Sequence, residues 1–123
     1  MIKKSKEFFI IAHNIRSLHN VGSIFRTADA FGVAKIFFTG YTGRPDNSVH
    51  VTKISKSGLG AEKWVAWEHY NSPVRLIKRL RLQKVSIIAL ENANGAINLR
   101  KFKPKFPLAL VLGEEVRGVS KAI

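Results

Sequence analysis

The sequence has no cysteine, which excludes disulfide scaffolds, thiolate zinc sites and cysteine nucleophiles. It also has no apolar run longer than a handful of residues, so no membrane span is predicted. The first seven residues, MIKKSKE, do not lead into the apolar region of a secretion signal. A cytoplasmic protein is therefore the default expectation.

Acidic residues are scarce. The sequence has eight Asp and Glu against 21 Lys and Arg, which gives a net charge of +13. A folded surface this positive attracts nucleic acid or an anionic membrane. The chain has 123 residues, of which 46% are apolar. That length and composition predict one domain with a single core and exclude a disordered tail.

Two phosphate-binding motifs are also absent. No GxGxxG follows the first predicted strand, and GxxxxGK[ST] occurs nowhere, which weakens a generic doubly wound nucleotide-binding protein as an alternative. The histidines lack metal-ligand spacing and the carboxylates do not cluster, so no metal site is predicted. We interpret the histidines as surface or loop residues: His13, His19, His50 and His69.

Short apolar runs alternate with amphipathic segments along the chain. The runs predict strands at 8–12, 33–39, 64–67, 85–90 and 108–112. A helix is predicted from Val21 to Phe31, with Gly32 at its end, and another after Ser72-Pro73 with Val74, Ile77 and Leu80 on one face. The segment 48–60 is ambiguous and includes a possible short helix ending at Ser57-Gly58. This alternation favours an α/β fold, with a mostly parallel sheet and helices on both faces.

The segment NVGSIFRTA (20–28) has two interpretations. It fits an ordinary amphipathic helix with Asn20 as N-cap and Arg26 in solvent. Alternatively, Gly22 admits a close backbone or a ligand. Arg26 then projects near the carboxyl edge of the sheet, where open α/β sheets bind ligands.

The last predicted strand runs directly into Gly113-Glu114, with a second glycine at 118. Alone, this pattern is also typical of a simple turn with two solvated acids. Together, three stretches resemble the SpoU-type (TrmH-like) RNA ribose methyltransferases of the SPOUT superfamily. They are NIRSLHNVGSIFRTADAFGV (14–33), SGLGAEKWV (57–65) and LALVLGEEVRGVS (108–120).

The resemblance implies a trefoil-knotted α/β domain that uses S-adenosylmethionine to methylate a ribose 2′-hydroxyl of tRNA or rRNA, as a homodimer. It implies catalytic roles for Arg26, Asn20 and Glu114. It implies cofactor binding at Leu90, Gly113 and Gly118. The family's third motif, a loop and helix that complete the knot, would follow Ile123. We therefore expect 1–123 to be a single SPOUT domain that ends before its fold does.

The implied chemistry suits these residues. A ribose hydroxyl is a weak acid and needs a group that accepts its proton or stabilises its charge. An arginine keeps its proton in proteins, so Arg26 is interpreted as an electrostatic clamp, oriented by Glu114. The donor sulfur carries its own positive charge, so the transfer needs no metal. The alternative is a non-catalytic RNA-binding domain of the same fold that has lost cofactor binding.

Basic residues gather in three groups, one of which follows Pro73 on the polar face of a predicted helix and is expected to track RNA phosphates. The groups are Lys3, Lys4 and Lys6; Arg75, Lys78, Arg79, Arg81 and Lys84; and Arg100, Lys101, Lys103 and Lys105. A membrane surface is the competing partner, but that helix lacks a Trp-rich apolar face. Trp64, Trp67 and Tyr70 are interpreted mainly as core residues, with base stacking as the alternative.

Overall fold

The computed structural model of the chain describes residues 7–89 and 105–113. Within them, the strands are β1 (Phe8–His13), β2 (Lys35–Thr39), β3 (Trp67–Tyr70), β4 (Ser86–Ala89) and β5 (Leu108–Gly113). The helices are α1 (Leu18–Phe31), α2 (His50–Gly58), α3 (Pro73–Leu82) and a short 3₁₀ helix, η1 (Ala61–Lys63). The strands form one sheet in the order β3-β2-β1-β5-β4, and every neighbouring pair is parallel.

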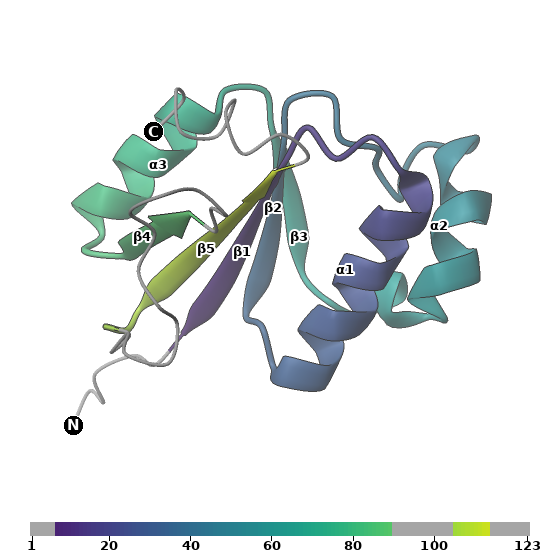
Figure 1. Cartoon of the computed structure of the whole chain (residues 1–123), viewed down its shortest axis with the longest axis horizontal. Coiled ribbons are helices and arrows are strands. Elements are labelled where there is room, and N and C mark those ends of the chain that lie inside the picture. The colour runs from purple at the N-terminus through teal and green to yellow at the C-terminus, as the bar shows by residue number, and fades with distance from the viewer. Residues whose placement is uncertain (1–6, 90–104, 114–123) are drawn as a thin grey trace, which may run out of the picture.

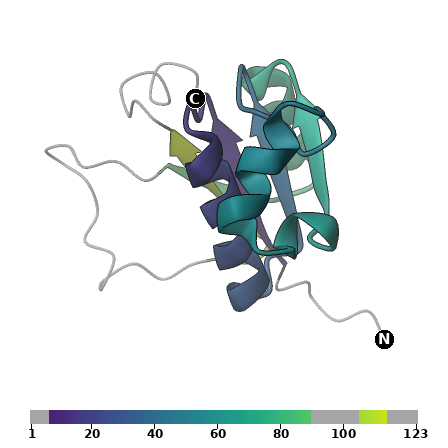
Figure 2. The same cartoon turned by 90° about the vertical axis from the view of Figure 1, so that its right-hand side faces the viewer.

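Helices cover both faces of this sheet, as predicted (Figure 1). On one face α1, α2 and η1 enclose a core that includes Phe25, Phe38 and Ile54. Figure 2 shows α1 and α2 side by side on this face. On the other face α3 packs Leu76, Ile77 and Leu80 over β1, β2 and β5. Both sheet faces are therefore buried, which explains why the central strands read as apolar runs.

The strand order places a switch point between β1 and β5. From β1 the chain passes outward through β2 to β3, and α3 then returns it across the sheet to β4 and β5. The carboxyl ends of β1 and β5 meet where His13 pairs with Gly113. Open α/β sheets bind ligands in the crevice at such a point, so the topology alone marks this end of the sheet.

The predicted strand at 64–67 is wrong. Residues 64–66 form an irregular turn that follows η1, and β3 begins only at Trp67, which pairs with Ile36 of β2. Trp64 is 63% exposed, and its indole Nε1–H donates to Asp29 Oδ1 at 3.0 Å, so its interpretation as a core residue is wrong as well. Trp67 and Tyr70 are partly buried and stack against Phe38 and Phe37, at centroid distances of 6.0 and 5.9 Å.

Helix α3 begins as predicted, with the Ser72 hydroxyl accepting from the Arg75 N–H at 3.2 Å and Pro73 in the first turn. Its buried face differs from the prediction, because Val74 is exposed and Leu76 is buried. Apolar residues at 74, 76, 77 and 80 fit two overlapping helical stripes, and only contact with the sheet selects one. The ambiguous segment 48–60 contains α2, which ends at Gly58.

Candidate active site

Ser17, and not Asn20, is the N-cap of α1. Its hydroxyl accepts a hydrogen bond from the Asn20 backbone N–H at 3.1 Å, in the geometry of a helix cap. The helix ends at Gly32, whose φ of 67° is left-handed, as the sequence predicts for a terminal glycine. Because Ser17 makes the cap, the Asn20 side chain lies in the first turn and can serve another purpose.

Gly22 allows α1 and α2 to approach closely. A Cβ at this position would overlap the Ser57 hydroxyl and the Ile54 carbonyl, and would lie 2.8 Å from the Gly58 backbone N. The Ser57 hydroxyl also donates to the His19 carbonyl at 2.6 Å, which ties the two helices together. Of the two partners that the sequence allows for Gly22, the structure therefore places a second backbone there.

A cavity of about 520 Å³ opens between α1 and the carboxyl ends of β1 and β5. The described residues that line it are Ile10, Ile15, Arg16, Ser17, Asn20, Ser23, Ile24, Thr27, Leu112 and Gly113. Its volume falls within the range of small-molecule and cofactor sites. Its walls combine an apolar floor with polar side chains along one face of α1, which suits a nucleoside with a polar tail. The cavity lies at the switch point of the sheet.

This cavity brings together two residues that the sequence implicates separately. Asn20 comes from the first motif and Gly113 from the last strand, and both line the same space. Gly113 reaches it because β5 pairs with β1 in register to the end of both strands. The tertiary structure thus joins one implied catalytic residue to one implied cofactor-binding residue.

Arg26 does not line the described part of the cavity with Asn20 and Gly113. It is exposed and is absent from the described lining of the cavity. Six residues separate it from Asn20, so the two side chains leave α1 roughly 120° apart around the helix axis. The exposed arginine agrees with the simpler interpretation of the helix. The remaining implied site residues, Leu90, Glu114 and Gly118, lie outside the described residues.

Hydrogen bonds fix the loop that leads from β1 into α1. The buried Thr42 hydroxyl accepts from the Ile15 N–H and donates to the Thr39 carbonyl, both at 2.9 Å. His13 Nδ1 lies 2.9 Å from the Thr39 hydroxyl. Burial lowers the pKa of His13 and favours its neutral form. The loop is thus held against the ends of β1 and β2, which sets where α1 begins.

The histidines only partly match their interpretation as surface or loop residues. His19 is exposed, but His13 ends β1 and His69 lies in β3, and both are partly buried. His69 Nε2 is 3.1 Å from the Gly40 carbonyl. Among residues 7–89 and 105–113, no group of three or more metal-binding side chains occurs. No helix within these ranges is long and apolar enough to cross a membrane.

Sequence reasoning missed Ser23 and Thr27 as cavity residues. Both are polar and lie three and seven residues after Asn20, which is the spacing of one helix face. Arg16 was missed as well, since it stands in a loop whose path depends on Thr42. A search for polar residues that share a helix face with Asn20 would have found Ser23 and Thr27.

This chain is similar to known proteins in both sequence and fold. The model of the SpoU rRNA methylase family matches residues 7–123. The tRNA (guanosine(18)-2′-O)-methyltransferase of Aquifex aeolicus is 30% identical over 122 residues, covering 98% of this chain and 55% of that protein. The chain therefore spans about half the length of this relative.

Solved structures of SpoU-type enzymes have the same fold as this chain. The TrmH/SpoU tRNA modifying enzyme of A. aeolicus is similar with a TM-score of 0.76 and 26% identity, over 92% of this chain and 55% of that one. The SpoU methyltransferase AviRb of Streptomyces viridochromogenes, in complex with the cofactor AdoMet, has a TM-score of 0.78 at 18% identity, over 96% and 47%. The second likeness concerns the fold alone. With its family model matched over nearly the whole sequence, the chain belongs to the SpoU rRNA methylase family.

Proposed function

We propose that this protein transfers a methyl group from S-adenosylmethionine to a ribose 2′-hydroxyl of tRNA or rRNA. The observation that carries the proposal is the cavity at the switch point, where Asn20 and Gly113 line one space. The A. aeolicus relative, named for methylation of a guanosine 2′-hydroxyl in tRNA, supports it.

The described cavity fits the cofactor. Ile10, Ile24 and Leu112 provide apolar surface for a nucleoside, and the hydroxyls of Ser17, Ser23 and Thr27 provide hydrogen-bond partners. None of its described lining residues is acidic or aromatic. When bound, S-adenosylmethionine would supply a methyl carbon on a positively charged sulfur, so that an oxygen–carbon bond could form as the carbon–sulfur bond breaks and leaves a neutral thioether. Gly113 and the implied residues Leu90 and Gly118 would hold it.

The protein's own task is to orient and activate the ribose hydroxyl. Asn20 can accept or donate a hydrogen bond at the mouth of the cavity and so orient that hydroxyl. Arg26 is proposed to stabilise the negative charge that develops on the oxygen, or the neighbouring phosphate, because it stays protonated. Glu114 is proposed to orient Arg26.

A non-catalytic RNA-binding domain of the same fold is the second candidate. It is favoured by the separation of Arg26 from Asn20 around α1 and by the exposure of Arg26. The two functions differ in one property, since only the enzyme needs to bind S-adenosylmethionine.

We further propose that the protein has the trefoil knot of its family, forms a homodimer and acts in the cytoplasm. The exposure of Arg26 outside the described cavity lining supports the dimer, because a second copy could bring its own cavity to that side of α1. The single continuous sheet supports treating residues 1–123 as one domain. Sedimentation analysis of the protein in the full length that its gene encodes tests the dimer.

The activity test uses that full-length protein, tritiated S-adenosylmethionine, and unmodified tRNA and rRNA transcripts. Transfer to ribose leaves the product resistant to alkaline hydrolysis at one phosphodiester, whereas methylation of a base does not. The expected result is one alkali-resistant dinucleotide in one RNA class. Calorimetric binding of the cofactor without any transfer to RNA, or no cofactor binding at all, would contradict the proposal.

A further inference from the structure

A second cleft, of about 400 Å³, lies between the start of α1 and α2. Its described lining residues are Arg16, Leu18, His19, Lys53 and Lys56, and none of them is acidic. Arg16 lines both this cleft and the cavity that contains Asn20, so the two spaces adjoin at that side chain. We call the second space the basic cleft.

Within residues 7–89 and 105–113, no acid pairs with the two lysines of the basic cleft. Lys53 and Lys56 are exposed and form no ion pair with any residue that the structure describes. Most described acids have partners elsewhere: Asp29 accepts from Trp64, Asp46 from Arg44, Glu62 from Ser55, and Glu68 from Lys35. Glu7 precedes β1 at the opposite end of that strand from Arg16. Concentrated positive charge in a concave site attracts an anion.

An exposed aromatic ring adjoins Arg16 at the edge of the basic cleft. Tyr41 is 54% exposed, and the Arg16 guanidinium carbon lies 5.7 Å from the centre of its ring. Cations beside an exposed ring are the combination that single-stranded RNA uses, since phosphates meet the charges and bases stack on the ring. An anionic membrane surface would instead require an apolar helix face, and the exposed residues of α2 include Thr52, Lys53 and Lys56.

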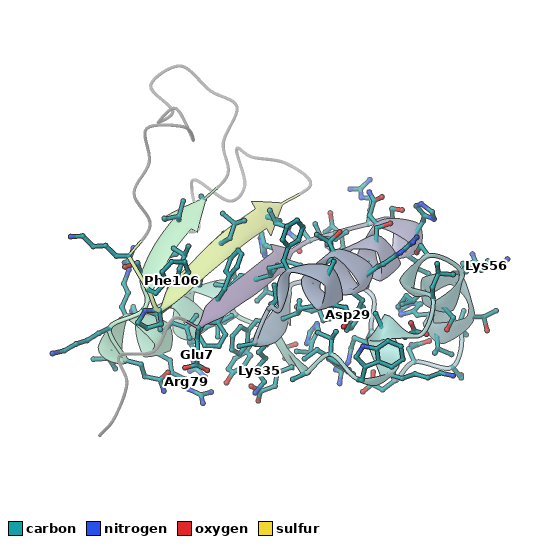
Figure 3. All side chains as sticks on the ribbon, turned by 90° about the horizontal axis from the view of Figure 1, so that it is seen from below. Glu7, Asp29, Lys35, Lys56, Arg79 and Phe106 are labelled. Carbon is teal, nitrogen blue, oxygen red and sulfur yellow. The ribbon has the colours of Figure 1, made fainter. Side chains whose placement is uncertain are left out.

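The basic cleft and the exposed basic residues of α3 lie on different parts of the molecule. Figure 3 shows Lys56 at one end of the molecule and Arg79, on α3, toward the other. The basic cleft shares Arg16 with the Asn20 cavity, whereas α3 lies on the opposite face of the sheet from α1. Of these two described basic surfaces, the basic cleft is the one that adjoins the cavity lined by Asn20.

We propose that the basic cleft binds a backbone phosphate adjacent to the target nucleotide, so that the RNA strand enters over α1 and α2 and not over α3. This inference rests on the proposed function for the identity of the nucleic acid. Lys53 and Lys56 supply the charge, and Arg16, held by Tyr41, connects the cleft to the reaction site. These residues position the substrate and take no part in the transfer itself.

The test compares two double variants with the same loss of charge. K53Q/K56Q removes two cations from the basic cleft, and K78Q/R81Q removes two exposed cations from α3. Affinity for a fluorescent single-stranded RNA is measured by anisotropy across a range of KCl concentrations. Loss of the proposed phosphate contact should reduce the slope of log affinity against log salt by about 0.7 for a single strand. K53Q/K56Q is expected to show this loss, and K78Q/R81Q a smaller change.

Equal effects of the two variants would overturn the proposal, because binding would then follow net charge alone. It is also overturned if the wild-type chain does not bind RNA at low salt, or if anionic phospholipid vesicles compete for Lys53 and Lys56 as effectively as RNA does. Near-UV circular dichroism confirms that both variants keep the fold.

Cofactor titration and methyl transfer are measured separately. An unchanged RNA KM in an active K53Q/K56Q enzyme refutes the cleft alone, whereas cleft-dependent RNA binding without any transfer refutes the proposed function alone.

Discussion

Replacing Gly22 with alanine should destabilise the protein, although alanine is the better helix former. The added methyl group would overlap the Ser57 hydroxyl and the Ile54 carbonyl of α2 and lie 2.8 Å from the Gly58 backbone N. Two of these three atoms belong to backbone, so the clash cannot be relieved by a rotamer change. The helices must separate, and the hydrogen bond from Ser57 to the His19 carbonyl must lengthen.

The expected size of the effect follows from three contributions. Overpacking a close contact costs about 1–3 kcal/mol. The strained hydrogen bond costs about 1 kcal/mol. The higher helix propensity of alanine returns about 1 kcal/mol. The net loss of unfolding free energy is therefore about 1–3 kcal/mol. For a chain of this size it should lower the urea midpoint by roughly 1 M, since each molar of urea lowers stability by about 1–3 kcal/mol.

Urea unfolding followed by far-UV circular dichroism measures this difference. Arg26 supplies a matched control, because it is exposed in the middle of the same helix. The difference between R26A and R26G gives the intrinsic advantage of alanine over glycine without any contact. If G22A gains stability by that same amount, the close contact between α1 and α2 is absent and the reasoning fails.

Three further predictions concern single side chains. Ser17→Ala should cost about 1 kcal/mol of unfolding free energy, because the Asn20 N–H loses its cap, and equal urea midpoints would remove Ser17 from that role. Burial would raise the pKa of Glu62, but hydrogen bonds from the Ser55 hydroxyl and the Gly60 N–H and the charge of Lys63 outweigh it and lower that pKa. A lowered carboxyl pKa stabilises the fold above the ordinary value near 4.5 and loses that contribution as the pH falls through the folded value. The stability advantage of the wild type over Glu62→Gln should therefore shrink as the pH falls below the ordinary value near 4.5, and a gap that is constant with pH would contradict this. Arg26→Ala in the full-length protein should reduce methyl transfer by a factor on the order of a hundred or more, with folding kept, and near-normal transfer would exclude Arg26 from catalysis.

Local pattern determined the strands of the sheet centre and the ends of two helices. The apolar runs at 8–12 and 108–112 became β1 and β5, since strands buried on both faces leave little room for polar residues. Gly32 and Ser72-Pro73 marked helix ends because their backbone preferences act within a few residues. The alternation of strands and helices was enough to predict a parallel sheet with helices on both faces.

Local pattern failed where a neighbour in space decided the outcome. Trp64 belongs to an apolar run of the length of a strand, but pairing with β2 begins only at Trp67, and Trp64 instead reaches Asp29 of α1. The N-cap of α1 is Ser17 and not Asn20, because Thr42 holds the preceding loop and fixes where the helix starts. The contacts between Trp64 and Asp29 and between Thr42 and Ile15 join residues far apart in the sequence, so no local pattern predicts them.

The sequence alone therefore determined the family, through short motifs, and the strongly positive net charge. Only the tertiary structure decided which of these residues meet. Asn20 and Gly113 line one cavity because β5 inserts beside β1, and strand order is not encoded in any local pattern. The same packing joins Lys53 and Lys56 to Arg16 across two elements. Contacts between distant segments depend on how the whole core is buried, so they are set by the fold and not by spacing along the chain.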